Sequence, residues 1–201
     1  VRLITRGEHL REIRDHGLEL KGAIEDRFEI PVFERIEKHD SFDAIFVTTK
    51  SYDTETAAKC TAGHLAENGC VVTVQNGIGN AEILAEHHGK KSIVIIRYVS
   101  SDEITLGALV RRSRTLDLAD SILRKAGIRT RLTDNITGAI WSKAIVNAAI
   151  NPLTAIHRCE NGRIITDERL NEQAIAVCEE GLRVAAAKRI VFDQDRNEHG
   201  E

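Results

Sequence analysis

The fold of this chain is decided by the stretch Ile136-Thr-Gly-Ala-Ile-Trp-Ser-Lys-Ala-Ile-Val-Asn-Ala-Ala-Ile-Asn-Pro-Leu-Thr-Ala-Ile-His-Arg-Cys-Glu-Asn161. Most of these residues are aliphatic or strong helix formers, which predicts a largely buried helix. Lys143, Asn147 and Asn151 interrupt the apolar run at positions i, i+4 and i+8. At about 100° per residue, the three side chains share one narrow stripe of the helix.

The polar stripe needs an explanation, because a lysine and two asparagines on a buried helix are unfavourable unless polar partners meet them. One interpretation is a solvent-facing stripe, or an internal network that fixes one packing arrangement. The other is a ligand-facing stripe, in which one proton donor and two amides hold a small polar molecule. Beyond the stripe, Pro152 predicts a kink in the helix after Asn151, and Asn161-Gly162 predicts a turn.

The composition is that of a globular protein. The 201 residues are 42% hydrophobic and 29% charged, enough for one sizeable core or two smaller ones. The formal net charge of −3 argues against a nucleic-acid surface, and no stretch resembles a signal peptide or a membrane span. Four cysteines without a CxxC pair lie in apolar segments, which predicts reduced, buried thiols in a cytoplasmic protein and no metal site: Cys60, Cys70, Cys159 and Cys178.

The chain contains no methionine, and it opens on Val1-Arg-Leu-Ile-Thr5, a strand candidate already under way. A natural protein of this length usually has several methionines. Two explanations stay open: parts of the protein are absent from this sequence, or the chain is a genuine fragment.

Strand and helix candidates alternate along residues 1–134. The clearest strand, Asp43-Ala-Ile-Phe-Val-Thr-Thr49, is almost continuously apolar, as a parallel central strand should be. Further strands are expected at residues 1–5, 70–75, 92–99 and 128–132, and helices at 8–16, 54–67, 80–88 and 115–126. This alternation predicts a doubly wound, Rossmann-type α/β sheet.

The pattern changes at Asp134-Asn135, beyond which it is all helical, with a long helix from Asp167 to about Arg189. We therefore expect two domains, a dinucleotide-binding domain over residues 1–134 and a helical domain over residues 135–201.

Polar residues follow three of the strand candidates: Arg6, Lys50 and Asn76. Ligands of open α/β sheets bind at the carboxyl ends of the strands. After the second strand of such folds, an acidic residue suits the ribose of NAD, whereas an arginine suits the extra phosphate of NADP. Arg6 thus favours NADP. The alternatives to ligand binding are that Lys50 is an exposed loop residue and that Asn76 is a turn residue before Gly77.

Three motifs, in this order, resemble the ketopantoate reductase family. They are Lys50-Ser-Tyr-Asp-Thr54, Gln75-Asn-Gly-Ile-Gly-Asn80, and Trp141-x-Lys143 followed by Asn147, Asn151-Pro-Leu-Thr-Ala155 and Asn161-Gly162. The resemblance covers nearly the whole chain. It is weakest between Val99 and Arg114, where we expect a pair of strands with 104–107 as a remnant.

The resemblance implies an NADPH-dependent enzyme that reduces 2-dehydropantoate to pantoate on the route to coenzyme A. It implies that Lys143 hydrogen-bonds the ketone oxygen and supplies the proton. Three asparagines would hold the substrate: Asn147, Asn151 and Asn161. Three residues would contact the cofactor: Arg6, Lys50 and Asn76.

Two parts of the family pattern have no counterpart in the sequence. No G-x-G-x-x-G turn is present, so we expect the first strand and its phosphate-binding turn upstream of Val1. The family also uses a glutamate and a serine from a later segment, and nothing after Glu180 resembles it, so we expect a helical domain that is truncated at its carboxyl end.

Other functions stay open. One is a reductase of another small 2-keto acid, and a second is a non-catalytic dinucleotide-binding relative. A third is a dimerisation module built on the long helix from Asp167. We expect a small keto acid as partner, with no nucleic acid and no membrane, and leave a homodimer open.

Overall fold

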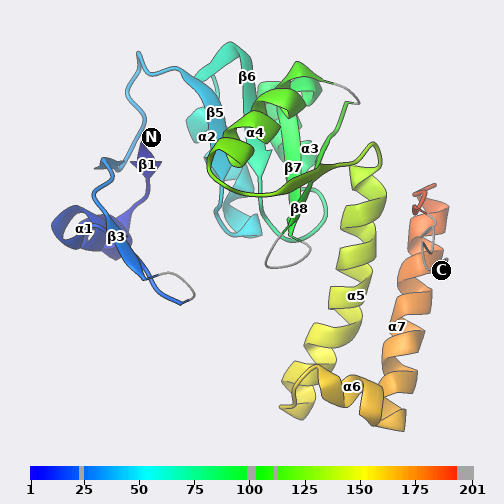
Figure 1. Ribbon diagram of the computed structural model, residues 1–201. Coiled ribbons are helices and arrows are strands. Elements are labelled where there is room, and N and C mark those ends of the chain that lie inside the picture. The colour runs from blue at the N-terminus through cyan, green and yellow to red at the C-terminus, as the bar shows by residue number, and fades with distance from the viewer. Residues whose placement is uncertain (23–24, 99–102, 111–112, 194–201) are drawn as a thin grey trace.

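The computed structural model describes residues 1–22, 25–98, 103–110 and 113–193. A central sheet has helices on both faces, and two long helices extend away from one end of it (Figure 1). Five strands of the described residues form this sheet in sequential order: β5 (Phe42–Val47), β6 (Leu65–Thr73), β7 (Ile93–Tyr98), β8 (Ile104–Ala108) and β9 (Thr130–Leu132).

The prediction of a Rossmann-type α/β part followed by helices is confirmed, but the sheet is mixed. β5, β6 and β7 are parallel to one another, and β9 is parallel to β8. β8, however, runs antiparallel to β7. Only residues 99–103 separate these two strands in the sequence, too few for the crossover of a dozen or more residues that parallel neighbours need. Of the strand pair expected between Val99 and Arg114, residues 99–102 and 111–112 lie outside the described residues.

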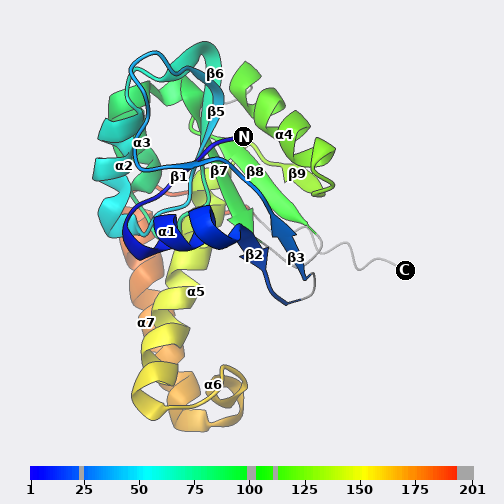
Figure 2. The ribbon, with the colours of Figure 1, turned by 90° about the vertical axis from the view of Figure 1, so that its left-hand side faces the viewer.

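The helices that flank the sheet are α2 (Thr54–Thr61) and α3 (Asn80–His88) on one face and α4 (Arg114–Lys125) on the other (Figure 2). α2 ends at Thr61, earlier than the predicted end near Glu67. Gly63 explains the early end, because its φ of +79° turns the chain out of the helix and into β6.

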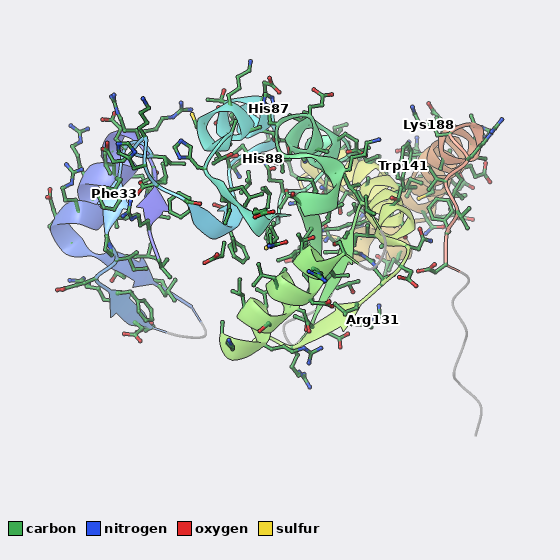
Figure 3. The ribbon with its side chains drawn as sticks, turned by 90° about the horizontal axis from the view of Figure 1, so that it is seen from above. Phe33, His87, His88, Arg131, Trp141 and Lys188 are labelled. Carbon is green, nitrogen blue, oxygen red and sulfur yellow. The ribbon has the colours of Figure 1, made fainter. Side chains whose placement is uncertain are left out.

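The amino-terminal residues form a small unit beside the sheet. α1 (Gly7–His16) follows β1 (Leu3–Ile4), which pairs in parallel with β4 (Val32–Phe33), and β2 (Leu18–Leu20) pairs antiparallel with β3 (Asp26–Phe28). Arg2 places its guanidinium carbon 5.4 Å from the centre of the Phe33 ring and forms an ion pair with Asp40. Phe33 lies at the opposite end of the molecule from Trp141 and Lys188 (Figure 3).

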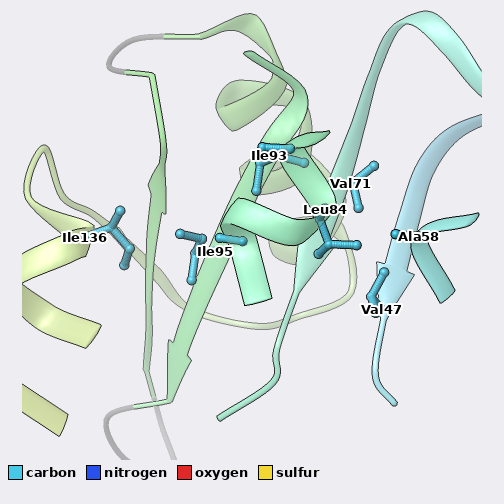
Figure 4. Close-up of a cluster of buried hydrophobic side chains, with 9 residues drawn as sticks. Val47, Ala58, Val71, Leu84, Ile93, Ile95 and Ile136 are labelled. Carbon is cyan, nitrogen blue, oxygen red and sulfur yellow. The ribbon is translucent and has the colours of Figure 1, made fainter. Parts of the chain in front are cut away.

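Both faces of the central strands are buried. On β7, Ile93 and Ile95 pack in a cluster with Leu84 of α3 (Figure 4). Val94, which points to the other face, packs in a second cluster with Leu116 of α4. This two-sided burial explains why the strand sequences are continuously apolar rather than alternating.

The helical part consists of α5 (Ile136–His157), α6 (Gly162–Thr166) and α7 (Glu168–Ala187). α7 runs back alongside α5, and α6 joins them at the far end (Figures 1 and 2). The two long helices approach closely at Gly181, where a Cβ would lie 2.9 Å from Cγ1 of Ile145. Asn135 caps α5 by accepting from the Gly138 N–H at 3.1 Å. It also donates to the carbonyl of Val191 at 2.9 Å, which ties the end of the helical pair to its beginning.

Two details of the helical part and the thiols differ from the prediction. α5 is less buried than its composition suggests, since Val146 and Ile156 are 46% and 73% exposed. α5 continues through Pro152 to His157, and the kink expected after Asn151 stays a prediction. The expectation of four buried thiols is wrong for Cys60, which is exposed on α2. By contrast Cys70 is fully buried, and burial raises the pKa of its thiol to about 11. All four cysteines are free.

Among the described helices, none is both long enough and apolar enough to span a membrane.

The sheet and the helical part meet where the start of α5 packs on β8. Ile136 is 2% exposed and joins the cluster on the α3 face of the sheet (Figure 4). It packs directly over Gly107, where an added Cβ would lie 2.4 Å from the Cβ of Ile136. The absence of a side chain at Gly107 therefore sets how closely α5 approaches the sheet.

Replacing Gly107 by alanine should force α5 away from the sheet. We expect Gly107→Ala to lower the free energy of unfolding by about 1–3 kcal/mol, the usual range for overpacking, as measured by thermal denaturation. The matched control is Gly162→Ala, because an added Cβ there has no atom within 4 Å. An unchanged melting temperature in Gly107→Ala would contradict this account of the packing.

Candidate functional site

A pocket lies between the connection that follows β6 and the first half of α5. Its walls come from the β6–α3 connection, from β7 and from one face of α5. The polar and aromatic residues of these walls include Gln75, Asn76, Asn80, Arg97, Trp141, Lys143 and Asn147. β6 and β7 are parallel neighbours, and this pocket lies at their carboxyl ends, where open α/β sheets bind their ligands.

Lys143 and Asn76 meet in this pocket although 67 residues separate them in the sequence. The Lys143 Nζ donates a hydrogen bond to the Asn76 Oδ1 at 2.9 Å. Asn147 lies one turn further along α5 and lines the same pocket. The structure thus brings together three of the residues that the sequence nominated, from both parts of the chain.

Two other nominated asparagines lie outside the pocket. Asn151 is exposed and stands eight residues after Lys143, which is about 12 Å along the helix axis. Asn161 is exposed in the turn before α6. In the described part of the chain, no hydrogen bond joins either side chain to the pocket, and a role for them in substrate binding stays a prediction.

The nominated cofactor residues lie at the ends of β1, β5 and β6. Lys50 is exposed after β5, and its backbone carbonyl accepts from the Gln75 Nε2 at 3.3 Å. Arg6 follows β1 and is the N-cap residue of α1. Its guanidinium is 71% exposed and lies 3.3 Å from Asp53 Oδ1.

A hydrogen-bond network, buried at Thr54 and Asn80, holds the connection after β6 against the connection after β5. Gln75 Nε2 donates to the Thr49 carbonyl and to Thr54 Oγ1, each at 2.9 Å. Thr54 Oγ1 lies 2.9 Å from Asn80 Oδ1, and Asn80 Nδ2 donates to the Asn76 carbonyl, also at 2.9 Å. Thr54 is fully buried and Asn80 is 6% exposed. The network fixes the backbone of Asn76 and thereby the position of its side chain under Lys143.

From the sequence, Thr54 and Asn80 were expected only at the start of a helix. Their positions in the two quoted motifs were a signal, because both motifs end on these polar residues. Their mutual contact, however, depends on how two connections 26 residues apart in sequence pack together. Arg97 was missed as well, although an arginine in the otherwise apolar strand Ile93–Tyr98 stands out.

The backbone of the β6–α3 connection is open where two glycines take left-handed conformations. Gly77 and Gly79 have φ of +101° and +97°, which side chains rarely adopt. An added Cβ at Gly79 would have no atom within 4 Å. A ligand can therefore approach this backbone closely.

The charges of the pocket are mainly positive. Lys143 and Arg97 supply the cations, and Glu82, which is exposed, supplies a carboxylate. Within the described residues, no group of three or more histidine, cysteine, aspartate and glutamate side chains is arranged to hold a metal ion.

Two family profiles match the chain. The profile described as "Ketopantoate reductase PanE/ApbA" matches residues 1–105, and its carboxyl-terminal counterpart, "Ketopantoate reductase PanE/ApbA C terminal", matches residues 135–200. The 2-dehydropantoate 2-reductase of Archaeoglobus fulgidus is 36% identical over 203 residues, covering 94% of this chain and 67% of the relative. The enzyme of the same name from Pyrococcus abyssi is 30% identical over 206 residues, covering 96% and 68%.

Solved structures show the same fold. A putative ketopantoate reductase from Ralstonia solanacearum MolK2 superposes with a TM-score of 0.84 at 18% identity, covering 98% of this chain and 72% of that one. A D-mandelate dehydrogenase with NADH and anilino(oxo)acetate superposes with a TM-score of 0.83 at 23% identity, covering 96% and 68%. The chain spans about two thirds of the length of the curated relatives named above. Since family profiles match both its sheet and its helical part, this chain belongs to the ketopantoate reductase family of oxidoreductases.

Proposed function

We propose that this protein reduces 2-dehydropantoate to pantoate with NADPH, as a step toward coenzyme A in the cytoplasm. The observation that carries the proposal is the 2.9 Å bond between Lys143 and Asn76 inside the pocket at the carboxyl ends of the strands. The names of the archaeal relatives, at 36% and 30% identity, support the choice of substrate.

The chemistry asked of the protein is to stabilise a developing alkoxide. NADPH, when bound, supplies the hydride that reduces the ketone. Lys143 carries protons at Nζ, and one of them would meet the ketone oxygen as negative charge develops on it. Asn76 accepts from the same ammonium group and so holds it in one orientation before the substrate arrives. Asn147, one turn away, would hold a polar group of the substrate.

The residues present fit a phosphorylated dinucleotide at two places. Arg6 presents a largely exposed guanidinium with a single described bond, to Asp53. An arginine has five N–H donors, so donors remain for the phosphate on the adenosine ribose. At the other end, Lys50 and Asn76 follow adjacent parallel strands, β5 and β6, where they would meet the nicotinamide half. The open backbone at Gly79 leaves room for that half to approach.

A second candidate is the reduction of another small 2-keto acid with NADH. The observation in its favour is the likeness to D-mandelate dehydrogenase, whose solved structures contain NADH. Because the fold is shared by both kinds of enzyme, the two candidates are separated by assay. Comparing kcat/KM for 2-dehydropantoate with that for other 2-keto acids, with NADPH and with NADH, decides between them.

Loss of the proposed proton donor should slow the reaction. We expect Lys143→Ala to reduce kcat by about 10²–10⁴-fold, the usual contribution of a positioned proton donor, as measured by NADPH oxidation. The control is Lys188→Ala, at the exposed end of α7, which should keep wild-type turnover. Normal turnover in a folded Lys143→Ala variant would remove the assignment.

Loss of Arg6 should weaken NADPH more than NADH. Charge-assisted hydrogen bonds contribute about 1.5–3 kcal/mol, so we expect Arg6→Ala to raise the KM for NADPH by roughly 10–100-fold while the KM for NADH stays within about twofold. Arg11→Ala, on the exposed side of α1, is the matched control. An equal rise in KM for both cofactors would mean that Arg6 does not recognise the phosphate.

Asn80 is proposed as a positioning residue that acts through Asn76. We expect Asn80→Ala to lower the free energy of unfolding by about 1–3 kcal/mol, since it leaves buried groups unpaired. We also expect kcat to fall by up to about 10²-fold, with the KM for the keto acid changing less, because a misplaced catalytic group slows the chemical step. Asn68→Ala, at an exposed position of β6, is the control. Wild-type kcat in Asn80→Ala would show that the network is structural alone.

A further inference from the structure

Arg97 is a cation of the pocket to which the proposed reaction has so far given no role. It stands near the carboxyl end of β7 and lines the pocket together with Lys143 and Asn147. Its Nε is buried and has no hydrogen-bond partner among the residues that the structure describes. A buried donor without a partner is unfavourable, and more so when the group is charged. Such a group is rare in folded proteins and indicates a missing partner.

The strand beside Arg97 carries a second unpaired polar atom. Thr105 on β8 is the direct cross-strand partner of Arg97, and its Oγ1 is likewise buried and without a partner. Residues that face each other in an antiparallel pair point to the same side of the sheet. That side is the one on which Ile136 of α5 packs against Gly107. Two unsatisfied polar groups are therefore gathered on the face that α5 covers.

No charge among the described residues neutralises Arg97. Glu82 is the carboxylate of the pocket wall, but it is exposed and forms no ion pair with Arg97. The other cation, Lys143, is bonded to the neutral amide of Asn76. A guanidinium that is partly buried and unpaired matches the shape and charge of a carboxylate, to which it can donate two parallel hydrogen bonds.

We propose that Arg97 binds the carboxylate of the 2-keto acid substrate, next to the ketone oxygen to which Lys143 donates a hydrogen bond. This inference rests on the proposed function and deepens it. In a 2-keto acid, the ketone and the carboxylate are on adjacent carbons, so the groups that bind them must belong to one small pocket. Lys143 from α5 and Arg97 from β7 both line this pocket.

The test compares Arg97→Gln and Arg97→Lys in the full-length protein, with Arg183→Gln, on the exposed side of α7, as control. Arg97→Gln should raise the KM for 2-dehydropantoate about 10–100-fold, the effect of one lost charge-assisted bond. Arg97→Lys should recover part of the loss. The Kd of NADPH should stay within about twofold, because the proposed ligand is the substrate. The KM for the lactone of 2-dehydropantoate, which has no carboxylate, should change little in Arg97→Gln.

Three results would overturn the inference. One is an unchanged KM for the acid in a folded Arg97→Gln variant. Another is an equal rise in KM for the acid and for the lactone, which would indicate a structural role. The third is a weaker Kd for NADPH with the acid unaffected, which would assign Arg97 to a phosphate of the cofactor.

A binding measurement separates this inference from the proposed function. Oxamate, a non-reactive analogue of 2-keto acids, and its neutral counterpart oxamide are titrated by calorimetry into the NADPH-saturated protein. Oxamate should bind more tightly than oxamide to the wild type, and the difference should vanish in Arg97→Gln. If oxamate binds in this way but 2-dehydropantoate is not reduced, the proposed function fails while the carboxylate site stands. If the wild type does not prefer oxamate, the carboxylate site fails.

Discussion

The contact between Ile136 and Gly107 is the constraint on which the rest of the site depends. A side chain at position 107 would occupy the space of the Ile136 side chain, so the missing Cβ sets the distance between α5 and the sheet. Lys143 follows Ile136 by seven residues, which is about two helical turns or 10 Å. A shift of the first turn of α5 would therefore move the ammonium group directly. Asn135 also holds this end of α5. Its side chain accepts from the Gly138 N–H and donates to the carbonyl of Val191, which follows α7 in the sequence.

The opposite wall of the pocket is held by a different kind of force. The backbone of Asn76 is fixed by directional bonds, chiefly from Asn80, rather than by apolar packing. The bond from Asn80 is part-buried and Asn80 itself is 6% exposed, so its amide is costly to leave unpaired and alternative geometries are disfavoured. One wall is thus set by steric packing and the other by hydrogen bonds, and the bond between Lys143 and Asn76 joins them. Such rigidity is what electrostatic stabilisation of a transition state requires, since the donor need not reorient during the reaction.

Sequence patterns predicted those parts of the structure that depend on local chemistry. Continuous apolar runs predicted β5 and β7. The rule that ligands bind at the carboxyl ends of strands indicated Asn76 as a residue near the ligand. The exposure of α5 was not predictable in the same way, because an apolar composition does not specify how many neighbours a helix has. The direction of β8 follows from the length of its connection to β7 more than from its residues. The partners of Thr54 and Asn80, and the isolation of Arg97, arise only when segments distant in sequence meet.

The two interpretations of the polar stripe make different demands on hydrogen bonding. A network that serves only to fix packing should satisfy its own buried members, because a partly satisfied network is worse than an apolar one. Around this pocket the loop network is well paired, whereas Arg97 is left with a buried, unpaired Nε and Lys143 contacts a neutral amide. Two cations in one pocket repel each other when neither has an ion-pair partner, and an anionic ligand relieves that cost. The uneven pairing therefore favours a negatively charged ligand at the part of the stripe that lines the pocket, Lys143 and Asn147, whereas Asn151 is exposed.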